Sequence, residues 1–207
     1  MRYDDFIKKV SPFQVFGDDL LNTLGWSKGA CALQLNRWTK SGKLIRLKRG
    51  LYTLPDSKGK RLFSVEWLAN RIYSPSYLSL DFVLSWYDLI PEKVTVVTSV
   101  SVLKTASFKN SFGQFEYRNL KKELFFGFEE KKDAFQNSIL MATPEKALLD
   151  FFYFYKGLEF SASFLEQGLR LQQLDQLKKS RLKKYAVQFE SKKISRITEI
   201  LLERIGS

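Results

Sequence analysis

A basic stretch of the chain, from Ser27 to Pro55, reads SKGACALQLNRWTKSGKLIRLKRGLYTLP. In its first half, Cys31, Leu35 and Trp38 recur at the i, i+4, i+7 spacing of one helix face. Ser27 is a typical N-cap residue, and Gly42 is a typical residue at which a helix ends. The stretch therefore predicts a helix that begins near Ser27 and ends before Gly42, with an apolar inner face and a basic outer one.

The residues on either side of this helix complete a recognisable unit. Before it, the segment from Asp18 to Leu24 predicts a short helix, which Gly25 ends. After it, Leu44–Lys48 and Leu51–Leu54 have the pattern of two short strands joined by a tight turn. A short helix, a turn, a longer helix and a basic hairpin are typical of a winged helix-turn-helix. In that fold the second helix enters the major groove and the wing contacts phosphates.

The charge of the chain favours the same interpretation. Its 207 residues include 34 Lys and Arg against 22 Asp and Glu, a net charge of +12. Eight basic residues and one acidic residue fall between Gly25 and Lys58 alone. A surface of this kind attracts nucleic acid, an anionic membrane or an acidic protein. Because the basic hairpin directly follows the helix pair, double-stranded DNA is the predicted partner.

Individual residues of this segment suit different parts of a DNA duplex. Asn36 matches adenine and Arg37 matches guanine, so these two are the candidates for contacts with base edges. The other basic residues are expected to contact phosphates. The full predicted DNA-binding set is Ser27, Lys28, Leu33, Asn36, Arg37, Lys40, Lys43, Arg46, Lys48 and Arg49.

Beyond a short polar linker, the pattern predicts a larger mixed domain. Helices are expected at Val65–Ile72, after a capping Ser79, from Thr143 to Tyr155, at about Phe164–Gln172, over Leu174–Phe189 with breaks, and at Lys192–Ile205. Strands are expected at Val94–Thr98, Leu103–Phe108, Phe115–Arg118, Leu124–Phe128 and Ile139–Ala142. The predicted fold class is α+β. A winged helix-turn-helix over residues 1–57 precedes a mixed α/β domain over residues 60–207, with a mainly antiparallel sheet and C-terminal helices.

Two features of the composition narrow the chemistry. The chain has no histidine, which removes Ser–His and Cys–His catalysis and every histidine-containing metal site. Its single cysteine, Cys31, permits no internal disulfide. The apolar runs are far shorter than the roughly 20 residues of a membrane span, and no signal peptide is recognisable. These features favour a cytoplasmic, disulfide-free protein with no membrane partner. Any enzyme built from these residues would have to use carboxylates, Lys, Tyr, Ser or a carboxylate-bound divalent ion; we expect no enzymatic activity, no cofactor and no metal.

Several motifs of the larger domain, taken with the winged helix, resemble a known family. They are PSYLSL (75–80), LIPE (89–92), VTVVT (94–98), FGQFEYR (112–118), ATPEKALLD (142–150), LRLQ (169–172) and SKK (191–193). In this order they are similar to the AbiEi antitoxins of type IV toxin–antitoxin systems, from about Phe16 to Ile205. The resemblance implies that the winged helix binds operator DNA and represses its operon. It also implies that the C-terminal domain neutralises a cognate nucleotidyltransferase-like toxin.

Other functions remain open from the residues alone. A metal-dependent nuclease needs carboxylates near a basic residue on a strand, and Glu116-Tyr117-Arg118 with Asp81 or Asp88 is the nearest match. An ion pair on a solvent-facing strand explains the same residues without catalysis. We interpret Glu145 and Asp150, which lie in the first two turns of the helix after Thr143, as structural or partner-contacting rather than catalytic.

A stand-alone winged-helix regulator is the second alternative. Its C-terminal domain would sense a ligand or a partner, and the aromatic run Phe151–Tyr155 would either line a pocket or belong to the core. A second basic segment, from Glu166 to the end, has ten basic and five acidic residues. This segment either extends the DNA path or faces an acidic toxin, and charge does not separate the two uses. The sequence leaves the oligomeric state undetermined.

Overall fold

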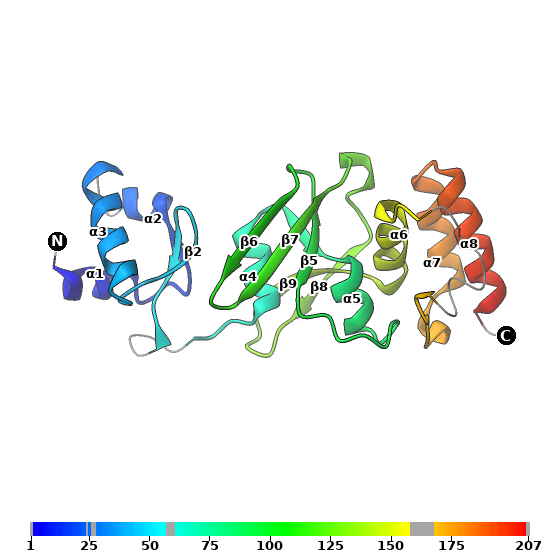
Figure 1. The fold of residues 1–207 in the computed structure, drawn as a ribbon, viewed down its shortest axis with the longest axis horizontal. Coiled ribbons are helices and arrows are strands. Elements are labelled where there is room, and N and C mark those ends of the chain that lie inside the picture. Colours follow the sequence, from blue (N-terminus) through cyan, green and yellow to red (C-terminus); the bar gives the residue numbers. More distant parts are fainter. Residues whose placement is uncertain (1, 24, 26–27, 57–60, 158–167, 206–207) are drawn as a thin grey trace.

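The structure is a computed structural model that describes residues 2–23, 25, 28–56, 61–157 and 168–205, except for the side chains of residues 28–31. Figure 1 shows the N-terminal helices and wing at one end, a large sheet in the middle and the C-terminal helices at the other end. The predicted α+β class is confirmed, and the N-terminal elements follow the order expected of a winged helix-turn-helix.

The N-terminal unit combines three helices with a small sheet. They are α1 (Tyr3–Val10), α2 (Asp18–Thr23), α3 (Lys28–Lys40), β1 (Phe16–Gly17), β2 (Ile45–Lys48) and β3 (Leu51–Thr53). The strands lie in the order β1-β3-β2, all antiparallel. Phe6, Leu35 and Trp38 lie in the buried core of this unit. The predicted hairpin is thus confirmed, whereas the two-residue strand β1 had no pattern that predicted it.

The middle of the molecule is a mixed sheet of six strands in the order β6-β7-β5-β4-β9-β8. The strands are β4 (Ser76–Leu78), β5 (Val97–Ser101), β6 (Ala106–Asn110), β7 (Gly113–Asn119), β8 (Phe128–Lys132) and β9 (Ser138–Ala142). Three neighbouring pairs, β6–β7, β4–β5 and β8–β9, are antiparallel. The pairs β5–β7 and β4–β9 are parallel, so antiparallel pairing is in the majority.

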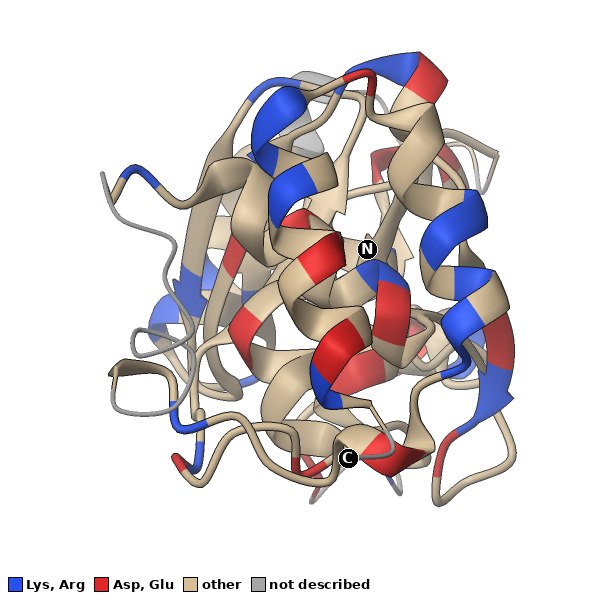
Figure 2. Ribbon diagram, turned by 90° about the vertical axis from the view of Figure 1, so that its right-hand side faces the viewer, with Lys and Arg blue, Asp and Glu red and all other residues tan. Residues whose placement is uncertain are grey.

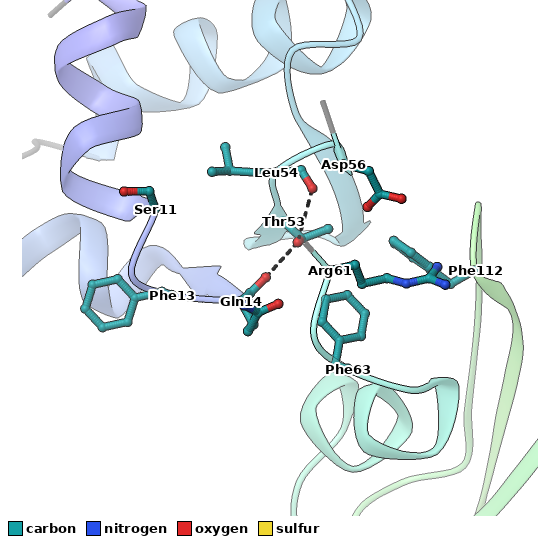
Figure 3. Close-up of a pocket in the computed structure, with 9 residues that line it drawn as sticks. All are labelled: Ser11, Phe13, Gln14, Thr53, Leu54, Asp56, Arg61, Phe63 and Phe112. Carbon is teal, nitrogen blue, oxygen red and sulfur yellow. Dashed lines mark hydrogen bonds between the residues drawn. The ribbon is translucent and has the colours of Figure 1, made fainter. Parts of the chain in front are cut away.

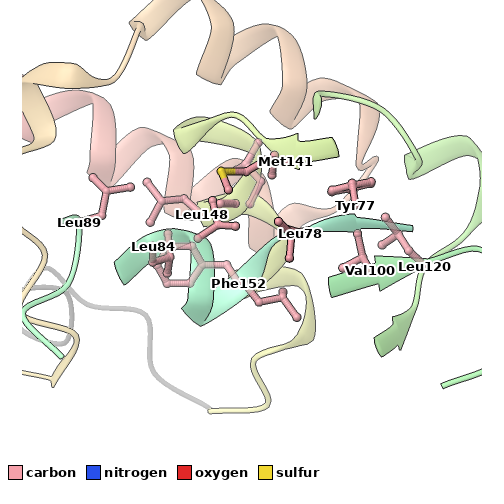
Figure 4. Packing of buried hydrophobic residues seen from close by; sticks show 14 of the residues in the cluster. Tyr77, Leu78, Leu84, Leu89, Val100, Leu120, Met141, Leu148 and Phe152 are labelled. Atoms are coloured by element: carbon pink, nitrogen blue, oxygen red, sulfur yellow. The ribbon is translucent and has the colours of Figure 1, made fainter. Parts of the chain in front are cut away.

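Helices cover this sheet and form the C-terminal end. They are α4 (Val65–Ile72), α5 (Leu80–Trp86), α6 (Pro144–Phe154), α7 (Lys179–Gln188) and α8 (Lys192–Arg204), with short 3-10 helices η2 (Lys122–Leu124) and η4 (Leu174–Gln176). Helix α6 contacts α5, α7 and α8, so it lies centrally among the helices of this half. Its start is as predicted, because the Thr143 hydroxyl accepts a hydrogen bond from the Lys146 amide and Pro144 lies in the first turn. Figure 4 shows Leu148 and Phe152 of α6 among the buried side chains.

Several predicted boundaries are wrong. Strand β5 begins at Val97 instead of Val94. Of the strand expected at Leu124–Phe128, Leu124 ends η2, residues 125–127 are in neither a helix nor a strand, and only Phe128 belongs to a strand, the first residue of β8. All five residues of β5 are buried, so no alternation of polar and apolar residues marks its ends.

Another error concerns the segment after the described gap. Of the helix expected at Phe164–Gln172, residues 164–167 lie outside the described residues. The segment Leu169–Gln172 is not helical, and Arg170 has a φ of 50°. The amide of Gln172 donates instead to the carbonyl of Leu89, so this segment pairs with a distant loop rather than with itself.

Candidate nucleic-acid interface

The outward face of α3 gathers the side chains predicted to contact DNA. Leu33, Asn36, Arg37 and Lys40 are all exposed, whereas Leu35 and Trp38 face the core. Residues three and four apart are neighbours on a helix surface, so these four form one continuous strip. Of the remaining predicted contacts on this helix, Ser27 lies outside the described residues, and Lys28 is described only by its backbone in α3.

Lys43 lies where the chain leaves α3. Gly42 has a φ of 70°, and the amide of Lys43 donates to the Trp38 carbonyl at 2.8 Å. Tyr3 then fixes the position of Lys43 in two ways. Its hydroxyl donates to the Lys43 carbonyl at 2.6 Å, and the Lys43 ammonium lies 4.9 Å from the Tyr3 ring centroid. A residue 40 positions away therefore holds Lys43 just beyond the C-terminal end of α3.

The tip of the wing depends on Gly50. This residue has a φ of 75°, and its carbonyl accepts a hydrogen bond of 3.3 Å from the Asp18 amide. A Cβ at this position would lie 2.8 Å from a carboxylate oxygen of Asp18. Arg46 and Arg49 are exposed on the hairpin. The wing thus presents two guanidinium groups, and its turn is held against the start of α2.

Lys48 is placed differently from the other predicted phosphate contacts. Its ammonium lies 5.9 Å from the Tyr73 ring centroid and 5.7 Å from that of Phe108, both in the second half of the molecule. The side chain is half-buried, and burial lowers the pKa of Lys48. The neighbouring Leu47 belongs to the hydrophobic cluster of the large sheet. The structure therefore directs Lys48 at the sheet, away from the surface that carries Arg46 and Arg49.

A small cavity and two hydrogen bonds of Gln14 lie at the junction between the two halves. Figure 3 shows this cavity, between the end of α1, the wing and the chain entering α4. The side-chain oxygen of Gln14 accepts a hydrogen bond from the Leu62 amide at 3.0 Å. The backbone carbonyl of Gln14 accepts one from the Thr53 hydroxyl at 2.6 Å. The cavity measures about 50 Å³. Ligand pockets are usually about 300–1,000 Å³, so this space suits water rather than an effector.

The comparison with known families falls on this same segment. Residues 17–55 match the family described as "Transcriptional regulator, AbiEi antitoxin". The resemblance noted in the sequence is thereby confirmed over α2, α3 and the wing. No curated protein matches the chain. Because the matched family is one of transcriptional regulators, it indicates DNA as the partner of residues 17–55. Within these residues, the exposed strip of α3 carries side chains that suit DNA.

The motif ATPEKALLD (142–150) contains a buried ionic network. Lys146 pairs with Asp150 one turn later, and both side chains are fully buried. The Tyr77 hydroxyl accepts from Lys146 at 2.9 Å and donates to Asp150 at 2.9 Å, and Ser79 donates to Asp150 at 2.8 Å. The predicted side-chain cap at Ser79 is therefore wrong, because its hydroxyl bonds Asp150 instead. Burial lowers the pKa of Lys146 and raises that of Asp150, while each partner opposes the shift of the other.

Glu145 joins two helices. Its carboxylate accepts a hydrogen bond of 2.9 Å from the amide of Lys178, at the start of α7, and lies 3.7 Å from the Arg181 guanidinium. The side chain is 1% exposed. Glu145 and Asp150 therefore both bind other parts of the fold, in agreement with their structural interpretation.

Two carboxylates of the nuclease alternative, Asp81 on α5 and Glu116 on β7, line the same pocket, whereas Asp88 is not among the described residues that line it. Glu116 lies on β7 and faces Arg118 at 3.9 Å, as expected for an ion pair on a strand. Burial raises the pKa of Asp81; Arg118 opposes this shift, and the nearby Glu116 carboxylate adds to it. Among the described residues, no group of three or more cysteine or carboxylate side chains is arranged to hold a metal ion.

The aromatic run of the ligand-sensing alternative belongs to the core. Phe152 is fully buried, and Phe151, Tyr153 and Phe154 pack against the same cluster. The carbonyls of Tyr153 and Tyr155 accept hydrogen bonds from the ammonium of Lys193, which thereby closes the end of α6. These aromatic side chains are therefore used for packing.

The second basic surface lies on α7 and α8. Figure 2 faces this end of the molecule and shows blue segments on both helices. Its exposed members are Lys178, Lys179, Lys183, Lys184, Lys192 and Arg196. No ion pair links any of them to a described acidic residue. In the described part of the chain, none of the helices has the length and apolar character needed to cross a membrane.

Proposed function

We propose that this protein is an antitoxin of a type IV toxin–antitoxin system that also represses its own operon. Residues 1–57 form the DNA-binding unit, which binds operator DNA by inserting α3 into the major groove while Arg46 and Arg49 of the wing contact phosphates. Residues 60–207 form the domain that neutralises a nucleotidyltransferase-like toxin. Like the rest of the proposal, this division extends beyond the matched residues 17–55.

One observation carries the DNA-binding half of the proposal. The exposed strip of α3 places Asn36 and Arg37, which suit base edges, directly beside Lys40, which suits a phosphate. The wing lies next to this helix in the chain and exposes Arg46 and Arg49. Base-reading and phosphate-binding side chains are thus combined within a unit whose order of elements is that of a winged helix.

A salt-series titration tests this half directly. Fluorescence anisotropy is measured with the duplex upstream of the gene and with a scrambled duplex of equal length. We expect tight, sequence-preferring binding that falls steeply as salt rises, because phosphate contacts release counterions. The variant Arg37→Ala/Arg49→Ala should lose most of the affinity. A matched control, Lys121→Ala/Lys122→Ala, removes the same charge from exposed positions outside the winged helix and should bind normally.

The outcomes of this titration separate the alternatives. Equal, weak binding to both duplexes would contradict operator recognition. The partner of the C-terminal domain would then be the main question. A parallel sample with Mg²⁺ shows whether the duplex stays intact. If the wild-type protein cleaves the duplex and Glu116→Gln does not, the nuclease interpretation is supported.

The toxin-neutralising half is tested with the second basic surface. We propose that this surface faces the toxin, since α7 and α8 lie at the end of the molecule opposite the wing. Reversal of Lys179, Lys183, Lys184 and Lys192 to Glu should abolish growth rescue when the nucleotidyltransferase-like protein of the same operon is co-expressed, with operator affinity unchanged. Lys193 is left intact because it closes the end of α6. Loss of operator affinity in this variant would instead assign the surface to the DNA path.

A further inference from the structure

An apolar side chain occupies the strip of α3 that is proposed to face DNA. Leu33 is 57% exposed, whereas the other large apolar side chains of the described part of α3, Leu35 and Trp38, are 2% and 5% exposed. Leu33 is not among the side chains that pack in either hydrophobic cluster of the described residues. Packing among the described residues therefore does not account for a leucine at this position.

The neighbours of Leu33 indicate what it faces. Asn36 and Arg37 follow it by three and four residues, so all three side chains lie on one turn of the exposed face. These two residues suit adenine and guanine edges. The apolar group that the major groove offers beside such edges is the 5-methyl group of thymine. A leucine next to two base-reading side chains matches that group in both position and chemistry.

We propose that Leu33 is a specificity-determining residue that contacts the 5-methyl group of an operator thymine, next to a base pair read by Asn36 or Arg37. The inference rests on the proposed DNA binding and deepens it, because it names the chemical group that α3 reads at this position. Ala32, also exposed on the same face, is small enough to leave the approach of Leu33 to the groove open.

Deoxyuridine substitution isolates this contact. A duplex of the upstream region prepared with deoxyuridine in place of thymidine keeps every hydrogen-bonding group and lacks only the methyl groups. We expect the wild-type protein to bind the uracil duplex about fourfold more weakly for each contacted methyl, the factor that follows from ~0.8 kcal/mol per buried carbon. Leu33→Ala should bind the thymine duplex more weakly than wild type and should barely distinguish the two duplexes.

Matched variants control for general effects. Val187→Ala also truncates an exposed apolar side chain, 75% exposed on α7, and should discriminate between the duplexes as wild type does. Asn36→Ala should lose affinity while keeping the thymine preference. Any effect of uracil on the shape of the duplex is common to all variants and cancels in the comparison. Circular dichroism checks that Leu33→Ala is folded.

The inference and the proposed function fail in different ways. If wild type prefers its own upstream thymine duplex over a scrambled one but binds the uracil duplex equally well, the thymine contact is overturned and operator binding stands. If Leu33→Ala weakens both duplexes by the same factor, the leucine acts elsewhere, for example between two protein copies, and the inference is also overturned. Absence of any sequence-preferring binding would overturn both.

Discussion

The side-chain amide of Asn110 donates a hydrogen bond of 3.1 Å to the carbonyl of Leu47, and so joins the end of strand β6 to the wing strand β2. Leu47 itself packs in the cluster of the large sheet, and the Lys48 ammonium lies over the rings of Tyr73 and Phe108. The edge strand of the large sheet therefore holds the wing, and the orientation of the wing depends on the second half of the molecule.

This docking predicts different roles for two adjacent basic residues. Arg49→Ala should weaken DNA binding and lower the slope of log affinity against log salt by about one, as expected for one lost phosphate contact. Lys48→Ala should leave that slope unchanged, because the ammonium is held on Phe108 and Tyr73. Anisotropy titrations at several salt concentrations measure both. An equal change of slope in Lys48→Ala would mean that the side chain leaves the rings when DNA binds.

The turn of the wing predicts a second pair of effects. Gly50→Ala adds both a strained positive φ and a Cβ 2.8 Å from Asp18, whereas Gly42→Ala adds only the strain, since nothing lies within 4 Å of its Cβ. We expect Gly42→Ala to lower the free energy of unfolding by about 1 kcal/mol and Gly50→Ala by clearly more. Urea denaturation measures both variants. When Gly50→Ala is made in an Asp18→Ala protein, its loss of unfolding free energy should come closer to that of Gly42→Ala. If the loss is the same with and without Asp18, contact with Asp18 is not its cause.

The sequence predicted the winged helix well because its information is local. The apolar spacing of α3, the position of Gly42 and the strand pattern of the hairpin all act within a few residues. The same holds for the start of α6, where Thr143 and Pro144 are adjacent in the chain. The exposure of Asn36 and Arg37 follows directly from the burial of Leu35 and Trp38 on the opposite face.

The features that the sequence could not predict depend on distant contacts. In the sequence, Lys48 cannot be told apart from the other basic residues of the wing. Its contact with the rings of Tyr73 and Phe108 depends on residues that are distant in the chain. Strand β4 has three residues and is fully buried, so it lacks both the length and the alternation that mark a strand. Ser79 stands at a cap position, yet Asp150, 71 residues later, takes its hydroxyl.

Because Lys146 and Asp150 form a buried ion pair, we expect the effects of replacing them on the free energy of unfolding to be strongly non-additive. Lys146→Met keeps most of the aliphatic volume but leaves the Asp150 carboxylate buried without its ion-pair partner, at a cost of about 3–5 kcal/mol in the free energy of unfolding. Asp150→Leu should be similarly costly, and the double variant should cost much less than the sum. A double-mutant cycle by urea denaturation measures the coupling.

An exposed pair serves as the control for this cycle. Lys132 and Glu130 are also bonded, at 3.4 Å, but both side chains are more than half exposed. The cycle built on Lys132→Met and Glu130→Leu should show little coupling. Additive effects at Lys146 and Asp150 would contradict the view that the two charges stabilise each other inside the fold.

Asp133 predicts a loss of stability in acid. Burial alone would raise the pKa of this carboxyl, but hydrogen bonds from Asn137, Ser64 and Phe135 outweigh it and lower the pKa to about 2. The carboxylate therefore stabilises the fold fully above pH 4, its ordinary pKa in the unfolded chain. This contribution, about 2 kcal/mol, is lost as the pH falls from about 4 to 2.

The comparison of wild type with Asp133→Asn measures this contribution. The asparagine keeps the shape of the side chain. Its NH₂ group is itself a donor, however, and it faces N–H groups that donate hydrogen bonds to the Asp133 carboxylate in the wild type. We expect the difference in free energy of unfolding between the two proteins to be largest at pH 5–7 and to fall by about 2 kcal/mol toward pH 2. Glu123→Gln, an exposed carboxylate on η2, should give a small difference throughout. A difference for Asp133→Asn that stays constant with pH would show that the hydrogen bonds to the loop after β8 do not depend on the charge of the carboxylate.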